Sequence, residues 1–89
     1  MGRAITDGAI ALMRSIVTAT YTPARDPACL TALREANAHL ALLRLLVDGA
    51  TKRRHLSLSQ RDHAFERMGD IGRGLGAWAR SLSSKRGPQ

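Results

Sequence analysis

The chain has 89 residues, aromatic residues make up only 3% of it, and 14 Lys and Arg against 7 Asp and Glu give a formal charge of +7. This length allows a single domain with a marginal core. The one cysteine, Cys29, excludes an intrachain disulfide, and no Cys/His cluster has metal-ligand spacing, so we expect oligomerisation to supply further buried surface. No apolar run approaches the ~20 residues that span a bilayer, and no secretory signal is recognisable. We therefore expect a cytoplasmic protein without membrane contact.

Arginine dominates the positive charge. Twelve of the 14 basic residues are arginine, whose planar guanidinium group donates two parallel hydrogen bonds to phosphate. A sequence pI above 11 is typical of nucleic-acid-binding domains. The alternative is an ordinary solvated surface, since small domains carry net charges up to about 8.

A first helix is predicted over residues 6–22, where apolar residues recur at spacings of three and four. Thr6 or Asp7 is expected to cap it. The stripe consists of Ile5, Ala9, Leu12, Met13, Ile16, Val17 and Thr20. Pro23 and Pro27 end the pattern, because two prolines four residues apart exclude a continuous helix.

A second helix is predicted over residues 27–52. Asp26 is a good N-cap, and Pro27 suits the first helical position, where its missing N–H would be unpaired anyway. The main apolar residues follow the 3-4-3-4 spacing of a coiled-coil seam; they are Leu33, Ala36, Leu40, Leu43 and Val47. Further leucines widen this stripe, which predicts packing against more than one neighbour.

A third helix is predicted over residues 58–82. Ser57 followed by Gln60 is a capping box, and Leu56 precedes it as a hydrophobic staple. The apolar stripe runs through Phe65, Met68, Ile71, Leu75, Trp78 and Leu82. The polar tail at 83–89 is expected to be disordered. The predicted fold is therefore all-α, a short antiparallel bundle of three helices forming one domain over residues 1–82.

Four glycines lie inside the third helix, at 69, 72, 74 and 76. Each costs about 0.8–1.0 kcal/mol relative to alanine. Gly72 and Gly76 share a face, which favours the close approach of another helix backbone, within the chain or between subunits. The predicted packing or oligomer-interface residues are Gly72, Leu75, Gly76 and Trp78. The alternative is a frayed, glycine-rich helix end.

The segments Leu56–Gln60 and Asp70–Trp78 resemble the C-terminal part of the accessory variability determinants, four-helix-bundle proteins that accompany the reverse transcriptases of diversity-generating retroelements. In that family the second element reads Glu-Ile-Gly-Arg-Met-Leu-Gly-Gly-Trp. Here Asp70, Gly74 and Ala77 replace the Glu, the Met and the second Gly. The resemblance covers about residues 33–82 and includes the Glu-Ala-Asn and Leu-Leu-Arg-Leu segments of the second helix.

The sequence also departs from the family pattern. Three helices are expected in place of four, and the connection before the third helix is about one turn longer. Arg61 stands where the family often has an aromatic residue. The resemblance implies a non-catalytic subunit without cofactor or metal that forms a ring-like homo-oligomer, often a pentamer. It also implies binding to a reverse transcriptase and to its template RNA or cDNA.

Nine basic residues are candidates for phosphate contact: Lys52, Arg53, Arg54, Arg61, Arg67, Arg73, Arg80, Lys85 and Arg86. The run Lys52–Arg54 is the strongest candidate, because Asp48 is the only carboxylate near it in the sequence. For Arg73 the alternative is an ion pair with Asp70, three residues earlier. For Arg44 an ion pair with Asp48 is preferred over phosphate contact.

An enzyme is not expected. The sequence shows no set of nucleophile, base and orienting group, no phosphate-binding loop and no metal triad. Two other classes of function stay open. One is a small DNA-binding regulator with the third helix as its recognition helix, and the other is a purely structural helical adaptor.

Overall fold

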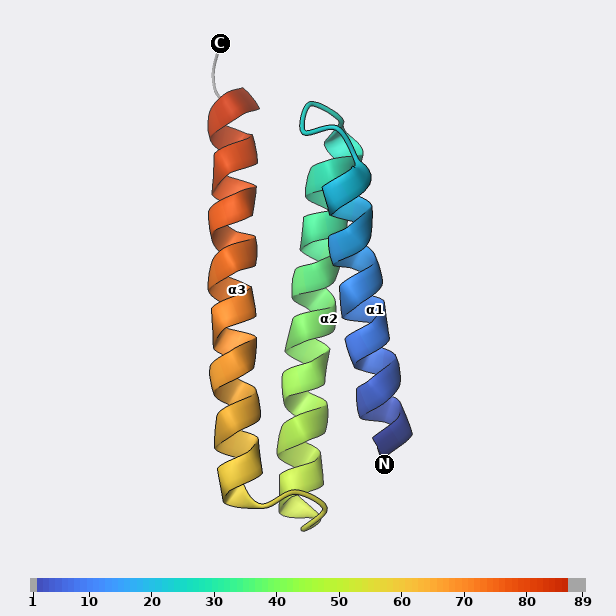
Figure 1. Ribbon diagram of the computed structural model, residues 1–89, viewed down its shortest axis with the longest axis vertical. Helices are drawn as coiled ribbons and strands as arrows, with labels where there is room; N and C mark the ends of the chain where they lie inside the picture. The colour runs from blue at the N-terminus through green and yellow to red at the C-terminus, as the bar shows by residue number, and fades with distance from the viewer. Residues whose placement is uncertain (1, 87–89) are drawn as a thin grey trace.

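The computed structural model describes residues 2–86, with side chains described for residues 3–83. It contains three helices, α1 (Gly2–Tyr21), α2 (Pro27–Lys52) and α3 (Leu58–Arg86), and no strand within these residues. The all-α prediction is therefore confirmed. The helices lie along one long axis, and the extents of the molecule are 51 × 20 × 14 Å. The two connections lie at opposite ends of this axis (Figure 1).

The starts of α2 and α3 follow from local sequence. Asp26 caps α2, where its Oδ1 accepts a hydrogen bond of 2.9 Å from the backbone N–H of Ala28. The capping box at α3 is reciprocal. The backbone N–H of Ser57 donates to Gln60 Oε1 at 2.8 Å, and the N–H of Gln60 donates to Ser57 Oγ at 3.1 Å.

Two helix ends differ from the sequence prediction. α1 begins at Gly2, so Thr6 and Asp7 lie inside the helix and do not cap it. The segment before Thr6 has no helix breaker after Gly2, and Arg3 pairs with Asp7 at 4.0 Å one turn on. α3 continues to Arg86, so the first half of the expected tail is helical, because residues 83–86 contain no proline or glycine that would end the helix. Residues 87–89 lie outside the described residues.

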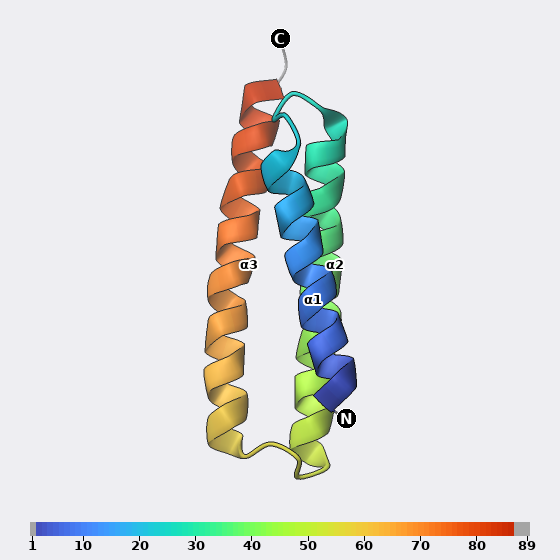
Figure 2. The same cartoon turned by 45° about the vertical axis from the view of Figure 1, so that its right-hand side comes forward.

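α2 is the central helix. Both α1 and α3 pack against it, whereas in the described residues the Cα atoms of α1 and α3 stay more than 8 Å apart (Figures 1 and 2). The predicted seam of α2 is buried in full, with Leu33, Ala36, Leu40, Leu43 and Val47 all less than 10% exposed. Cys29 lies in the same core. The prediction that α2 has more than one neighbour is therefore confirmed.

Within one copy of the chain, no described backbone atom of another helix lies within 4 Å of a Cβ placed on an α3 glycine. A Cβ placed on Gly72 would lie 3.3 Å from Arg44 Nη2 and 3.4 Å from Leu40 Cδ2 of α2, so Gly72 does face a neighbouring helix. A Cβ placed on Gly76 would lie 3.4 Å from the Arg80 guanidinium of the same helix, with no other helix within 4 Å among the described residues. Leu75 is buried in the core, and Trp78 packs against it while partly exposed. Of the four predicted packing residues, Leu75 and Trp78 pack in or against the core of the chain. Gly72 and Gly76 instead leave room for arginine side chains.

The glycine cost can be measured directly. Nothing lies within 4 Å of a Cβ at Gly74, so we expect Gly74→Ala to raise the free energy of unfolding by about 0.5–1 kcal/mol. Gly72→Ala is the matched variant. Its increase in the free energy of unfolding should be smaller, because Arg44 and Leu40 must move to make room for the new Cβ. Urea denaturation of both variants gives the two values, and equal gains would show that the contact at Gly72 is not tight.

Candidate nucleic-acid interface

The α2–α3 connection carries the run Lys52–Arg54. α2 closes in a Schellman motif, in which Arg54 N–H donates to Thr51 O at 2.9 Å and His55 N–H donates to Ala50 O at 2.8 Å. This motif needs a residue in the left-handed region, usually glycine, and here it is Arg54, with φ = 64°. Within the described residues Arg54 is the only non-glycine residue with positive φ.

A long side chain at this position costs stability. A left-handed conformation costs an L-residue with a Cβ roughly 1 kcal/mol relative to glycine. Arg54 is exposed, and no carboxylate among the described residues pairs with it. The turn therefore presents a guanidinium group to solvent that contributes no ion pair to the fold.

Asp48 organises the neighbouring charges. Its carboxylate accepts from Lys52 Nζ at 3.1 Å and from Arg61 Nε at 3.4 Å, so one anion serves two cations from two helices. The hydrogen bond from Lys52 is the largest cause that lowers the pKa of Asp48, and the charges of Lys52 and Arg61 lower it further. Arg44, expected to pair with Asp48, instead donates to the backbone carbonyl of Met68 at 3.4 Å.

Arg61 is held on three sides. Besides Asp48, it contacts Asp62 at 3.2 Å, and its guanidinium carbon lies 4.6 Å from the centroid of the Phe65 ring. Its side chain is about two-thirds buried. The contact with Asp48 joins the start of α3 to the end of α2. The main role of Arg61 in this structure is therefore to link the two helices. Phosphate contact by Arg61 stays a prediction.

Three guanidinium groups lie against glycines along one side of α3. Arg44 of α2 lies over Gly72, while Arg73 and Arg80 reach back over the helix positions four residues before them, Gly69 and Gly76. Arg73 also forms the expected ion pair with Asp70. Arg73 and Arg80 are seven residues apart and so share a face. We call Arg44, Arg73 and Arg80 the arginine row.

The other candidates lie elsewhere. Arg67 is exposed and is six residues before Arg73, which places it about 120° around the helix from the arginine row. Arg53 is exposed next to Arg54. The side chains of Lys85 and Arg86 lie outside the described residues. The run Lys52–Arg54, Arg61 and the arginine row therefore all lie on α2, on α3 or on the connection between them. Arg67 lies on a different face of α3 from the arginine row.

Sequence reasoning missed two features. The left-handed backbone at Arg54 has no local signal, since neither glycine nor asparagine occupies the position. The role of Arg44 depends on the absence of a side chain at Gly72, on a different helix. The spacing of Gly69, Gly72 and Gly76 was a signal for something lying close to α3, but it did not show that this was arginine.

No group of His, Cys, Asp or Glu side chains in the described part of the chain could hold a metal ion. None of the three helices, as far as they are described, combines the length and the apolar character needed to cross a membrane. Comparisons with protein-family models, with curated proteins and with solved structures found no match to this chain.

Because the backbone of Arg54 is strained, replacing this residue by glycine should stabilise the fold. We expect Arg54→Gly to raise the free energy of unfolding by about 1 kcal/mol, because glycine adopts positive φ without steric cost. Arg54→Ala removes the same charge but keeps the Cβ, so its stability should stay near that of the original chain. Urea denaturation separates the two effects, and equal stability of the glycine and alanine variants would argue against backbone strain.

The lowered pKa of Asp48 predicts the pH dependence of its contribution. A carboxyl whose pKa is lower in the folded state stabilises the fold above its unfolded pKa, ordinarily 3.8, and loses this effect as pH falls through the folded value. We expect Asp48→Asn to lower stability by a constant amount above about pH 5. The difference should shrink towards zero in stronger acid. Thermal unfolding from pH 7 to pH 2 measures it, and a difference independent of pH would contradict the ion-pair origin.

Proposed function

We propose that this protein is a non-catalytic accessory subunit of a diversity-generating retroelement, which binds nucleic acid through α2 and α3 and supports a reverse transcriptase. The observation that carries the nucleic-acid part is Arg54, an exposed arginine kept in a left-handed turn beside two further cations. The reverse-transcriptase part rests on the resemblance of Leu56–Gln60 and Asp70–Trp78. The cDNA made on the template RNA would be a second nucleic-acid ligand.

The charges fit contact with phosphates. Around the α2–α3 connection, the four cations Lys52, Arg53, Arg54 and Arg61 stand against two carboxylates, Asp48 and Asp62, so this end of the molecule keeps excess positive charge. Exposed ion pairs are worth at most about 1 kcal/mol, so phosphate can compete for Lys52 and Arg73. From Arg61 to Arg80 the cations extend over roughly 28 Å of helix, which suits an extended polyanion.

The contacts would position RNA without reading its sequence. Base reading on single strands needs exposed aromatic side chains. Phe65 and Trp78 are partly buried against the core, and Tyr21 lies at the end of α1, next to the opposite connection (Figure 1). Phosphate contacts fix register and orientation but carry no sequence information directly.

A structural adaptor is the second candidate. Among the described residues, the candidate cations Lys52, Arg61 and Arg73 have carboxylate partners within the chain. If these pairs persist in the presence of RNA, these three cations are not available to phosphate and the helices serve other proteins. This reading predicts no salt-dependent binding to RNA.

RNA binding in a salt series tests the nucleic-acid part. We expect affinity for a retroelement template RNA to fall linearly with the logarithm of salt concentration, by about 0.7 units for each phosphate contact. Arg54→Gly should reduce that slope by about one contact and weaken binding to all RNA sequences alike, although it stabilises the fold. Arg25→Ala, at the opposite connection, removes the same charge and should change binding less.

The same measurements separate the alternatives. Equal weakening by Arg54→Gly and Arg25→Ala would show a general charge effect without a site. A mixture with the matching reverse transcriptase then tests the second part, where a ternary complex is expected by light scattering. RNA binding without any complex with the enzyme would leave a nucleic-acid-binding protein and refute the link to a retroelement.

A further inference from the structure

α1 carries four of the eight large hydrophobic residues that are exposed in the described part of the chain. Among the described helices, only α2 has Cα atoms within 8 Å of it, and the packed face includes the buried Leu12 and Ala19. A second row of large apolar side chains remains in solvent on α1. Ile10, Met13, Val17 and Tyr21 are 44%, 63%, 52% and 84% exposed. A helix that is apolar on more than one face ordinarily packs against more than one neighbour.

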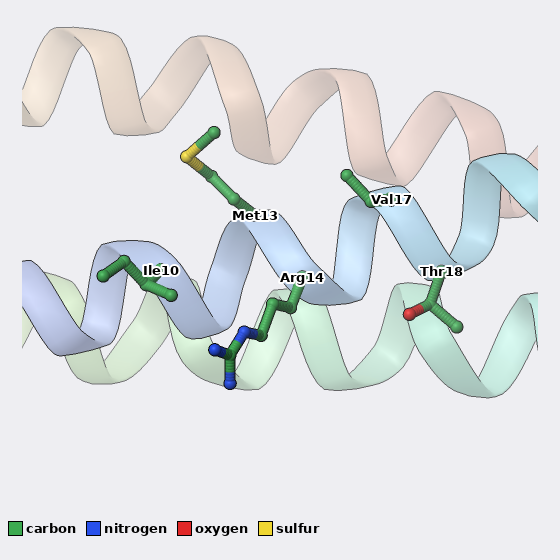
Figure 3. A pocket seen from close by; sticks show the side chains of 5 residues that line it. All are labelled: Ile10, Met13, Arg14, Val17 and Thr18. Carbon is green, nitrogen blue, oxygen red and sulfur yellow. The ribbon is translucent and has the colours of Figure 1, made fainter.

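These four residues, which we call the outer stripe, follow one another at spacings of three, four and four. Such spacing places them along one side of the helix. Ile10, Met13 and Val17 line an open hollow together with Arg14 and Thr18, and Met13 and Val17 point towards the side on which α3 lies (Figure 3). The hollow is open to solvent and is lined by α1 residues alone, and no Cα atom of α3 comes within 8 Å of one in α1 among the described residues.

We propose that the outer stripe is the contact between two copies of this chain, packed α1 against α1. Two observations favour a second copy as the occupant. A stripe with coiled-coil spacing is complementary to itself, since its side chains fit between those of an identical stripe. When two copies of α1 pack together, each outer stripe buries the other, so no different protein is needed to cover them.

Charge gives the second argument. Each copy carries +7. Contact through α2 and α3 would bring together the arginine rows of two copies and their turn cations, by which we mean Lys52, Arg53 and Arg54. From Ile10 to Tyr21, α1 has one charged residue, Arg14. The outer stripe is thus the large apolar surface on which two copies can meet with little like-charge repulsion. It also leaves α2 and α3 open for nucleic acid.

This contact differs from the predicted one. The sequence placed the interface at Gly72, Leu75, Gly76 and Trp78, but Leu75 is used inside the chain. A twofold contact through α1 joins two copies, so a ring of five would require a further, head-to-tail contact. A single helix face is a small interface, and we expect dissociation in roughly the micromolar range.

Sedimentation or light scattering over a concentration series tests the proposal. In Met13→Gln/Val17→Gln, both changes are at exposed positions, keep the net charge and retain a good helix former, so the fold should persist, as circular dichroism can verify. We expect the dimer to dissociate at least ten times more readily. Leu42→Gln/Leu45→Gln is the matched control, because these leucines are 51% and 70% exposed on α2, and it should leave the dimer unchanged.

Salt and Arg14 give two further readouts. Salt screens the repulsion between two cationic chains, so self-association should strengthen as salt increases, whereas RNA binding weakens. Arg14→Gln removes the one charge beside the stripe and should tighten the dimer. A chain that stays monomeric at high concentration and high salt would overturn the proposal. So would a control pair on α2 that disrupts association as much as the α1 pair.

This inference does not depend on the proposed function. The α1 double variant should retain RNA binding per chain, because its changes lie on a helix that carries none of the candidate cations. Loss of the dimer with intact RNA binding supports both proposals, whereas a dimer that never binds RNA refutes only the proposed function. An unchanged dimer in the α1 variant refutes only the α1 contact.

Discussion

The packing of α2 between α1 and α3, whose Cα atoms stay more than 8 Å apart in the described residues, governs the whole molecule. α2 supplies eight buried residues, and three of them are alanines, so the outer helices can approach it closely. Its seam contributes Leu33, Leu40 and Val47 to the core, to which α1 adds Leu12 and α3 adds Met68 and Leu75. Without α2 the other helices would have no common partner. The open side between α1 and α3 is a direct consequence of this arrangement.

The same arrangement separates charge from apolar surface. The arginine row and the turn cations lie on α2 and α3, whereas the outer stripe lies on α1. A protein with a net charge of +7 resists association wherever its cations gather. If copies pair through α1, the charged helices remain accessible. The proposed self-association and the proposed binding of nucleic acid therefore use different surfaces and respond to salt in opposite directions.

At the α2–α3 connection, residues that hold the two helices together lie beside the candidate nucleic-acid-binding residues. Asp48 and Arg61 connect the two helices across the turn, while Lys52 shares the same carboxylate. Arg54, one turn away, is placed by the Schellman motif that ends α2. Here the chain accepts a strained backbone at an arginine. Conformations of this kind persist only where the surrounding structure fixes them, and they point to a use for the side chain.

Local sequence by itself determined where α2 and α3 begin, because the caps at Asp26 and Ser57 are contacts over two or three residues. The 3-4-3-4 pattern likewise determined which face of α2 is buried. Only the tertiary structure decided that α2 lies between α1 and α3, that Arg44 lies over Gly72 and that Asp48 pairs with cations from two helices. These depend on side chains far apart in the chain, and helical periodicity gives the face of a residue but not the residue opposite it.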